Sequence, residues 1–325
     1  MSTQAMPTGP SDGPVLRLHD DPAATLEAAS WALAAMIGTM RDALTSPLAQ
    51  VLAADPQRTA VLEAAGLVRR DGDDLVPHPA LVPADEPTAR SAVEARLSSL
   101  RQALSAATHD ETSAEGGWAG QSDEVLLSQG RASAATGRAL ATKVVPRLSG
   151  LAERLGRDGG RVLDVGTGVA ALALALAGEF PHAEIVGIDI LDRALDLARK
   201  ELASAPAGAD RVSLRRLDVA EVSDRSRYDL IWLPAPFVAE STLTVALPRL
   251  IDALRPGGWL VAGTNPAPAQ PLRQAVGRWN AVRSGGNSFD TDHMAATLTD
   301  AGMEDVRRFP TVPGGPVLVA ARRTG

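Results

Sequence analysis

The second half of this chain alternates short β-branched runs with helical stretches, and few folds accommodate such an alternation. Strand-like runs begin at Arg161, Glu184, Arg211, Tyr228 and Gly258, and helical stretches separate most of them. Strands that alternate with helices indicate βαβ units and therefore a parallel sheet.

The chain ends in two more strand-like runs, over 303–309 and 316–323, which a short turn-rich link joins. A parallel crossover needs about a dozen residues or more, so this last pair should be antiparallel. We therefore expect an α/β fold with a Rossmann-like, mostly parallel seven-stranded sheet whose last strand is antiparallel.

The front of the chain is mainly helical. Apolar residues recur at helical spacing over Pro22–Leu44, and two shorter helices are predicted over 47–54 and 57–65. Two short strand-like pieces around an Asp-Gly turn predict a hairpin over 67–77. Helix, helix and hairpin form the outline of a winged helix, which often binds DNA.

The charges of this front region argue against a nucleic-acid partner. Residues 1–100 contain seven arginines, no lysine and thirteen acidic residues, and the whole chain has a net charge of −7. A DNA duplex would be repelled by such a surface. We therefore interpret the front as a packing or dimerisation module.

Composition excludes several other classes. There are no cysteines, which removes disulfide scaffolds and thiolate catalysis, and the five histidines are never paired at metal-ligand spacing, so no metal site is expected. No apolar run approaches the roughly 18 residues of a membrane helix. The first residues lack the pattern of a signal peptide, so we expect a cytoplasmic protein without a membrane partner.

The most informative motif is a glycine turn between a strand and a helix, Val162–Ala170, which reads VLDVGTGVA. Glycine allows positive φ and close approach of a ligand to the main chain, and the helix start supplies free N–H groups. Asp189 ends the next strand, 21 positions after Gly168, where a carboxylate can accept hydrogen bonds from ribose hydroxyls.

Two ligand classes fit this turn. Gly166, Gly168 and Ala171 satisfy the loose dinucleotide fingerprint, which favours a nicotinamide-dependent reductase. Asp164 favours the other class, since a carboxylate beside the turn repels a pyrophosphate but suits the ammonium of an amino-acid moiety. S-adenosylmethionine carries such an ammonium, no phosphate, and a ribose for Asp189.

Asp164–Gly168 resembles the first motif of the class I S-adenosylmethionine-dependent methyltransferases. Three further segments match that family in order: Asp189, Leu217–Val219, and Leu254–Val261 with its turn into the fifth strand. The resemblance covers about 146–325 and implies a site for S-adenosyl-L-methionine. The residues expected to hold it are Asp164, Gly166, Thr167, Gly168, Asp189, Ile190, Asp218 and Val219.

The front resembles the winged-helix-like dimerisation domain of small-molecule methyltransferases from natural-product pathways. The resemblance implies a homodimer, a helical dimerisation or substrate domain over 15–110 and a cofactor domain over 146–325. The Pro/Gly/Ser/Thr-rich composition of 1–14 predicts a disordered tail, and helical patterns predict linking helices over 111–145.

The acceptor side departs from that family. Many of its O-methyltransferases carry a catalytic histidine in the second half, but this chain reads Trp232–Phe237, without His or Asp, after the fourth strand. By position alone, His293 is the candidate general base. The residues expected to form the substrate wall are Trp118, Arg131, Trp232, Phe237 and Phe289.

We therefore expect methyl transfer to a small, aromatic or polyketide-like molecule by in-line displacement in a pocket that excludes water. Three alternatives stay open: a protein that binds the cofactor without methylating, or an enzyme of different chemistry on this fold; a nicotinamide-dependent reductase; and, least favoured, a DNA-binding regulator.

Overall fold

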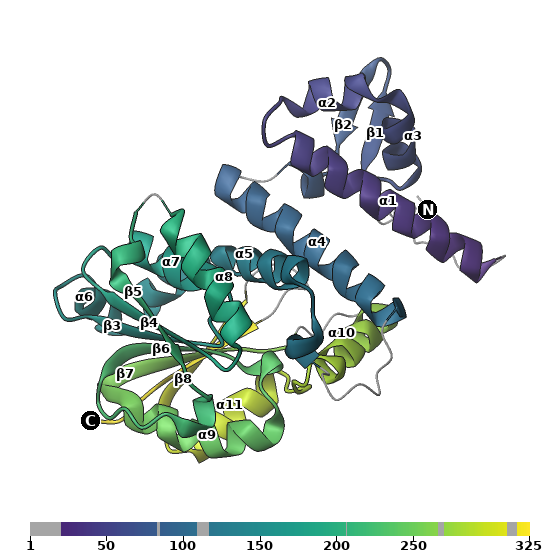
Figure 1. The fold of residues 1–325 in the computed structure, drawn as a ribbon. Coiled ribbons are helices and arrows are strands. Elements are labelled where there is room, and N and C mark those ends of the chain that lie inside the picture. The colour runs from purple at the N-terminus through teal and green to yellow at the C-terminus, as the bar shows by residue number, and fades with distance from the viewer. Residues whose placement is uncertain (1–20, 83–84, 109–116, 206, 266–269, 311–316) are drawn as a thin grey trace, which may run out of the picture. The chain divides into compact units, whose positions relative to one another are not determined.

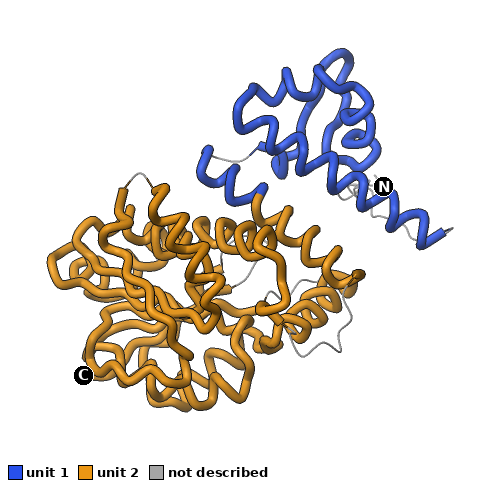
Figure 2. The backbone as a smooth tube through the Cα atoms, in the orientation of Figure 1, with its two compact units in different colours: residues 1–93 blue, residues 94–325 orange. Residues whose placement is uncertain are grey.

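The computed structural model describes residues 21–82, 85–108, 117–205, 207–265, 270–310 and 317–325. The chain divides into two compact units, 1–93 and 94–325 (Figure 2). The division falls at Val93, inside helix α4 (Glu86–Thr108), whereas the sequence predicts a boundary near residue 110. The four predicted domain ranges stay predictions, and the tail expected over 1–14 lies outside the described residues.

The first unit contains three helices followed by a hairpin. Its elements are α1 (Pro22–Asp42), α2 (Leu48–Ala54), α3 (Pro56–Ala64), β1 (Val68–Asp71), β2 (Asp74–Pro77) and the short helix η1 (Pro79–Leu81). The side chains of Asp21 and Asp55 cap α1 and α3 by accepting hydrogen bonds from backbone N–H groups. Gly72 turns between the antiparallel strands with a φ of 61°, which glycine adopts without strain. The predicted helices and hairpin are present, while the winged-helix assignment stays a prediction.

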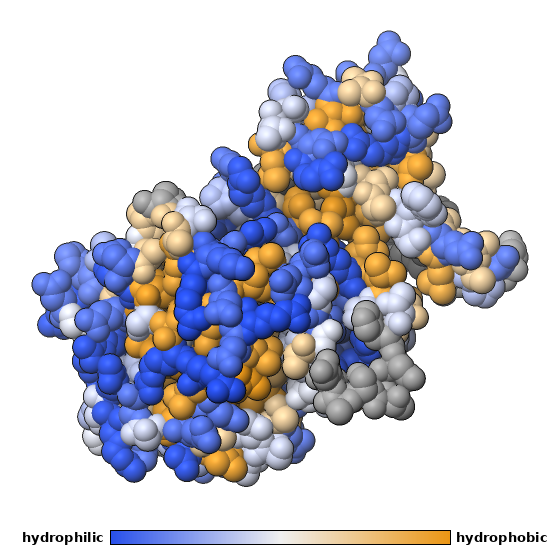
Figure 3. Space-filling model, in the orientation of Figure 1, coloured by the Kyte–Doolittle hydropathy of each residue, from blue (hydrophilic) through white to orange (hydrophobic). Residues whose placement is uncertain are grey.

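Apolar side chains reach the surface of this unit on α1. Leu26 and Trp31 are 54% and 75% exposed, and orange side chains are visible along α1 in Figure 3. Scattered apolar residues are normal on a protein surface, but a tryptophan this exposed is unusual because its large ring gains most from burial.

The second unit is built on the predicted seven-stranded sheet. Its strands lie in the order β5-β4-β3-β6-β7-β9-β8, and β9 is antiparallel to both of its neighbours. Their bounds are β3 (Arg161–Val165), β4 (Glu184–Asp189), β5 (Val212–Arg216), β6 (Tyr228–Pro234), β7 (Leu254–Gly263), β8 (Glu304–Pro310) and β9 (Val317–Arg322). The expected α/β fold with an antiparallel last strand is confirmed.

Helices cover both faces of this sheet, as Figure 1 shows. One core packs the sheet against α6 (Leu151–Leu155), α7 (Ala171–Glu179) and α8 (Asp192–Ala203), and the other packs it against α9 (Glu240–Ala253) and α11 (Thr291–Asp300). The remaining helices are α5 (Asp123–Ala139), α10 (Pro271–Arg283), and the short turns η2 (Gly117–Gly120), η3 (Leu140–Val144), η4 (Val145–Arg147), η5 (Ala209–Arg211), η6 (Val219–Glu221) and η7 (Ala235–Phe237). No helix in the described part of the chain is both long and apolar enough to span a membrane.

The strand order changes direction between the neighbouring strands β3 and β6, with β4 next to β3 on the other side. This makes the boundary between β3 and β6 a topological switch point. In open α/β sheets ligands bind at such a switch, beyond the carboxyl ends of the strands. The glycine turn follows β3, so the fold brings the most informative motif to the edge where a ligand is expected.

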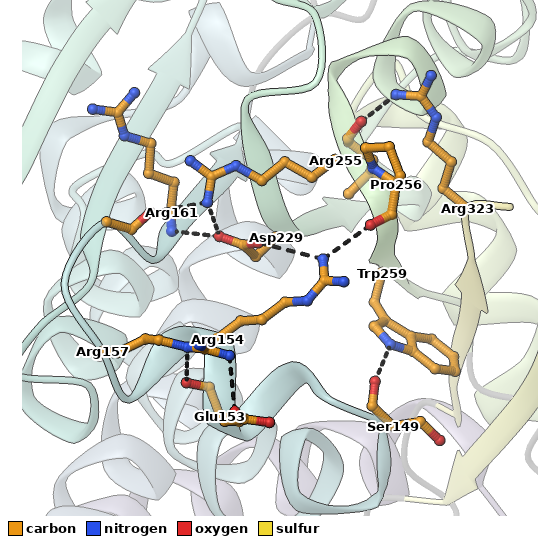
Figure 4. A network of polar contacts seen from close by, with 12 residues as sticks. Ser149, Glu153, Arg154, Arg157, Arg161, Asp229, Arg255, Pro256, Trp259 and Arg323 are labelled. Carbon is orange, nitrogen blue, oxygen red and sulfur yellow. Dashed lines mark hydrogen bonds and ion pairs between the residues drawn. The ribbon is translucent and has the colours of Figure 1, made fainter. Parts of the chain in front are cut away.

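At the amino ends of the strands, away from the glycine turn, arginines surround a buried carboxylate (Figure 4). Asp229, near the start of β6, is 1% exposed. Its Oδ2 accepts from the backbone N of Arg161 at 3.0 Å and from Arg255 Nη1 at 2.7 Å, and Arg154 Nη1 lies 3.6 Å from Oδ1. This cluster fastens β3, β6, β7 and α6 together at the end away from the glycine turn.

Candidate cofactor and acceptor site

The glycine turn has the backbone that the sequence predicts. Gly166 and Gly168 have φ values of 60° and 54°, a region that favours glycine. Ala170 also has a positive φ, 62°, and α7 begins directly after it. A positive φ is uncommon for a residue other than glycine, which marks Ala170 as the last residue of the turn's unusual backbone.

Glycines on both sides of Thr167 shape the turn. A Cβ at Gly168 would meet no atom within 4 Å, so the main chain there is open to a ligand. A Cβ at Gly187, on the neighbouring strand β4, would lie 2.7 Å from Thr167 Oγ1. Gly187 therefore makes room for the Thr167 side chain, a role that sequence reasoning missed because nothing distinguishes this glycine within its strand.

Asp189 ends β4 beside the turn. Its Oδ2 accepts from Gly168 N at 2.9 Å and its Oδ1 accepts from Leu191 N at 2.9 Å. Burial raises the pKa of the carboxyl, and the N–H groups of Leu191, Gly168 and Ile190 partly oppose that shift. The carboxylate thus ties the glycine turn to the start of α8 while part of the residue stays accessible.

Asp164 is the second carboxylate at this edge. The residue is 1% exposed, and its Oδ2 accepts from Thr167 Oγ1 at 2.7 Å. Burial raises its pKa to about 7, the Thr167 hydroxyl opposes the shift, and the nearby Asp189 adds to it. No Arg, Lys or His in the described ranges forms an ion pair with Asp164 or Asp189.

The burial of Asp164 bears on its expected role. A side chain with so little exposed surface holds the turn through Thr167. Direct contact between Asp164 and an ammonium stays a prediction.

Ile190, Asp218 and Val219 are the remaining residues that the resemblance predicts around the cofactor. Ile190 is 56% exposed directly after Asp189 and offers an apolar surface. Asp218 caps η6, its Oδ1 accepting from Ala220 N at 2.8 Å, and Val219 is buried in the core. Leu217 N donates to the backbone O of Asp189, which joins these two strand ends.

Two of the predicted substrate residues contact each other. The rings of Trp118 and Phe237 are 5.5 Å apart at an interplanar angle of 77°, an edge-to-face pair. Phe237 is 45% exposed and lies just beyond β6. Trp232 differs, because it is 7% exposed and packs in the core over Gly263.

Arg131 is held by acidic residues. Its Nε and Nη2 donate to Glu201 of α8 at 2.9 and 2.7 Å, and Glu94 lies 4.0 Å from Nη1. This pair fastens α5 to α8, so the structure gives Arg131 a structural contact. Its predicted contact with a substrate stays a prediction.

Phe289 and His293 lie together on the α9 and α11 side of the sheet. Their rings stack with centroids 3.9 Å apart, at the start of α11. Both line a cavity of about 320 Å³ between α9 and α11, together with Leu233 and Glu240. The residues of the glycine turn do not line this cavity, so the structure does not bring His293 to the turn.

Comparison with known proteins assigns the sheet domain. Residues 162–258 match the methyltransferase-domain family, from the strand before the glycine turn to the turn into β7. This part of the chain is therefore similar to a methyltransferase domain. Of the two ligand classes, the match favours S-adenosyl-L-methionine over a dinucleotide.

The match extends to whole proteins only in part. The chain is 35% identical over 139 residues to the demethylmenaquinone methyltransferase of Deinococcus radiodurans, a segment that covers 41% of this chain and 54% of that protein. The chain spans about half the length, or less, of the curated relatives it matches.

Solved structures share the fold over nearly the whole chain. A putative O-methyltransferase from Nostoc punctiforme has a TM-score of 0.64 at 16% identity, covering 96% of this chain and 100% of that one. Human N-acetylserotonin methyltransferase, solved with S-adenosylmethionine, has a TM-score of 0.63 at 16% identity, covering 98% and 100%. These likenesses establish the fold of the methyltransferase domain and of the helical region in front of it.

Proposed function

We propose that this protein transfers a methyl group from S-adenosyl-L-methionine to a small-molecule acceptor. The observation that carries the proposal is the carboxyl edge of β3 and β4. There an open glycine main chain stands beside two buried carboxyl groups, Asp164 and Asp189, for which the described residues supply no cation. A cationic ligand would compensate that charge, whereas a dinucleotide would bring two phosphates against it.

The residues present fit the cofactor. Asp189 would accept from the ribose hydroxyls, and the exposed Ile190 would contact the adenine. The main chain of Gly166–Gly168 would lie along the amino-acid part, with Asp164 behind it. The bound cofactor supplies a methyl group that is already activated on a sulfonium, so the chain mainly aligns the acceptor and excludes water.

Small, aromatic or polyketide-like acceptors are the class that we propose. The Trp118–Phe237 pair supports this, since the exposed ring of Phe237 just beyond β6 and the partly buried ring of Trp118 offer an apolar wall to a flat molecule. Two of the similar proteins are named for methylating such molecules, demethylmenaquinone and N-acetylserotonin.

The ribose role of Asp189 gives the first test. Asp189→Ala should weaken the binding of S-adenosylhomocysteine about 100-fold, because two hydrogen bonds to a charged acceptor are lost. Isothermal titration calorimetry measures this. The control is Asp196→Ala on the exposed face of α8, whose carboxylate pairs only within its own helix with Arg199 and should leave the affinity unchanged.

The same titration separates the rivals. Tight binding of NADH without binding of S-adenosylhomocysteine would overturn the proposal in favour of a reductase. Incorporation of labelled methyl into a panel of phenols and hydroxyquinones tests the transfer itself. Cofactor binding without turnover on any acceptor would favour a protein that binds S-adenosylmethionine without methylating.

His293 remains our proposed general base by its position in the sequence; its ring stacks on Phe289 in a cavity that the glycine turn does not line. If it accepts the acceptor's proton, His293→Ala should lower kcat about 100-fold and leave the affinity for S-adenosylhomocysteine unchanged. An unchanged kcat would remove it from the mechanism, and the acceptor would then need no base from this side chain.

We also propose a homodimer formed through the helical front, in the cytoplasm. The exposed Leu26 and Trp31 on α1 support an apolar contact between two copies. Sedimentation of the wild type and of Trp31→Glu tests it, with a monomer expected for the variant.

A further inference from the structure

Helix α5 packs on α7 through two glycines. A Cβ at Gly130 would lie 2.3 Å from Val169 Cγ2, and a Cβ at Gly137 would lie 2.8 Å from the backbone O of Leu172 and 2.9 Å from Ala175 Cβ. The two glycines are seven residues apart, two helical turns, so they lie on one face of α5. Neither position has room for a side chain.

Val169 belongs to the glycine turn itself. It stands between Gly168, whose N–H donates to Asp189, and Ala170, which has the positive φ that starts α7. Val169 is fully buried and packs in a small cluster with Leu126 of α5 and Leu197 of α8. Close-packed interiors transmit such displacements, so a shift of Val169 reaches Gly168 directly.

Two polar contacts hold α5 and the segment before it in place. Arg193, in the first turn of α8, donates to Asp123 Oδ1 at 2.5 Å and to the backbone O of Gln121 at 2.7 Å. Arg131 pairs with Glu201 further along α8. Since α5 is fastened on both sides of the Gly130 contact, an added methyl group there would push on Val169 rather than lift the helix.

We propose that Gly130 is a positioning residue for the cofactor: by admitting Val169 against α5, it sets the glycine turn at the place where Gly168 meets Asp189 and the ligand. The proposal rests on the proposed function, since it concerns the same cofactor. Gly137 also packs closely on α7, but it meets Leu172 and Ala175, three and six residues beyond Val169, and no residue of the glycine turn.

The test compares four variants by calorimetry with S-adenosylhomocysteine and by thermal unfolding. Gly130→Ala should weaken binding about tenfold, while Gly137→Ala should lower the melting temperature at least as much and change the affinity less than twofold. Gly130→Ala combined with Val169→Ala removes the methyl group that clashes and should return the affinity to within about threefold of Val169→Ala alone.

The outcomes separate cleanly. Failure of the wild type to bind S-adenosylhomocysteine overturns the proposed function but not the close packing of Gly130 against Val169. Equal losses of affinity in Gly130→Ala and Gly137→Ala, or no rescue in the double variant, overturn the positioning role. If Gly130→Ala does not fold, the double variant decides, because it keeps the alanine and lacks the clash.

Discussion

An aspartate is buried at each end of the central strands, and the two carboxylates differ in the partners that surround them. Asp229, at the amino end of β6, is 1% exposed and has Arg255 at 2.7 Å and Arg154 at 3.6 Å (Figure 4). Asp164, near the carboxyl end of β3, is equally buried, but its side chain accepts from the Thr167 hydroxyl and stands near a second acid, Asp189.

The difference teaches which end is structural and which is poised for a ligand. A buried charge costs several kcal/mol of unfolding free energy unless a partner compensates it. The chain supplies that partner at Asp229 with its own arginines. At Asp164 burial leaves the pKa raised to about 7, and under the proposed function the positive charge of the ligand would compensate this carboxylate.

The largest effect is expected at the compensated end. Asp229→Ala should lower the unfolding free energy by about 3 kcal/mol, since it leaves the arginines of this cluster without their carboxylate, although both are about one-third open to water. Urea unfolding measures the loss. The surface variant Asp252→Ala, which breaks only an exposed pair with Arg225, should cost less than about 0.5 kcal/mol.

Affinity for S-adenosylhomocysteine should survive Asp229→Ala within about threefold, because the cluster lies at the far edge of the sheet. A large loss of affinity with intact folding would show that the two ends are coupled and would break the comparison.

The next effect is a change in pH dependence at the uncompensated end. A carboxyl whose pKa is raised in the folded state binds its proton more tightly when folded, so its contribution to stability is complete below about 3.8 and is lost as pH rises through about 7. Without ligand, the unfolding free energy of the wild type should therefore fall between these values more steeply than that of Asp164→Asn. Identical slopes would mean that folding does not raise the pKa of Asp164.

The smallest effect concerns the hydroxyl of Thr167, which donates to Asp164. Thr167→Val removes the hydrogen bond to Asp164 and should cost about 1 kcal/mol of unfolding free energy. It should also raise the pKa of Asp164 further, because that bond lowers it. Thr142→Val, whose hydroxyl donates to the backbone O of Arg138, serves as the control, and an equal loss there would show that the effect is not specific to the bond with Asp164.

Much of the fold followed from local patterns. The β-branched runs predicted all seven strands, because burial on both faces imposes a distinctive apolar composition, and the short final link predicted the antiparallel β9. The glycine turn and Asp189 were also predictable from local restrictions. A φ above zero favours glycine in the turn, and the end of a strand restricts which residue can follow it.

What the sequence could not provide is contact between distant segments. Nothing local distinguishes Gly187, whose missing side chain admits Thr167, or Gly130, which admits Val169. Arg131 was expected at the substrate and pairs with Glu201, 70 residues away. Trp232 was expected at the substrate wall, and the sheet register turns it into the core. Such pairings depend on packing, which periodicity does not encode.

Proton linkage tests the central claim most directly. Binding of S-adenosylhomocysteine is measured calorimetrically at about pH 6.5 in two buffers of different ionisation enthalpy, beside binding of adenosine, which lacks the ammonium. The account predicts that S-adenosylhomocysteine releases protons in the wild type, since its ammonium lowers the pKa of Asp164, and that adenosine, or Asp164→Asn with either ligand, releases fewer. Equal proton release by both ligands would contradict it.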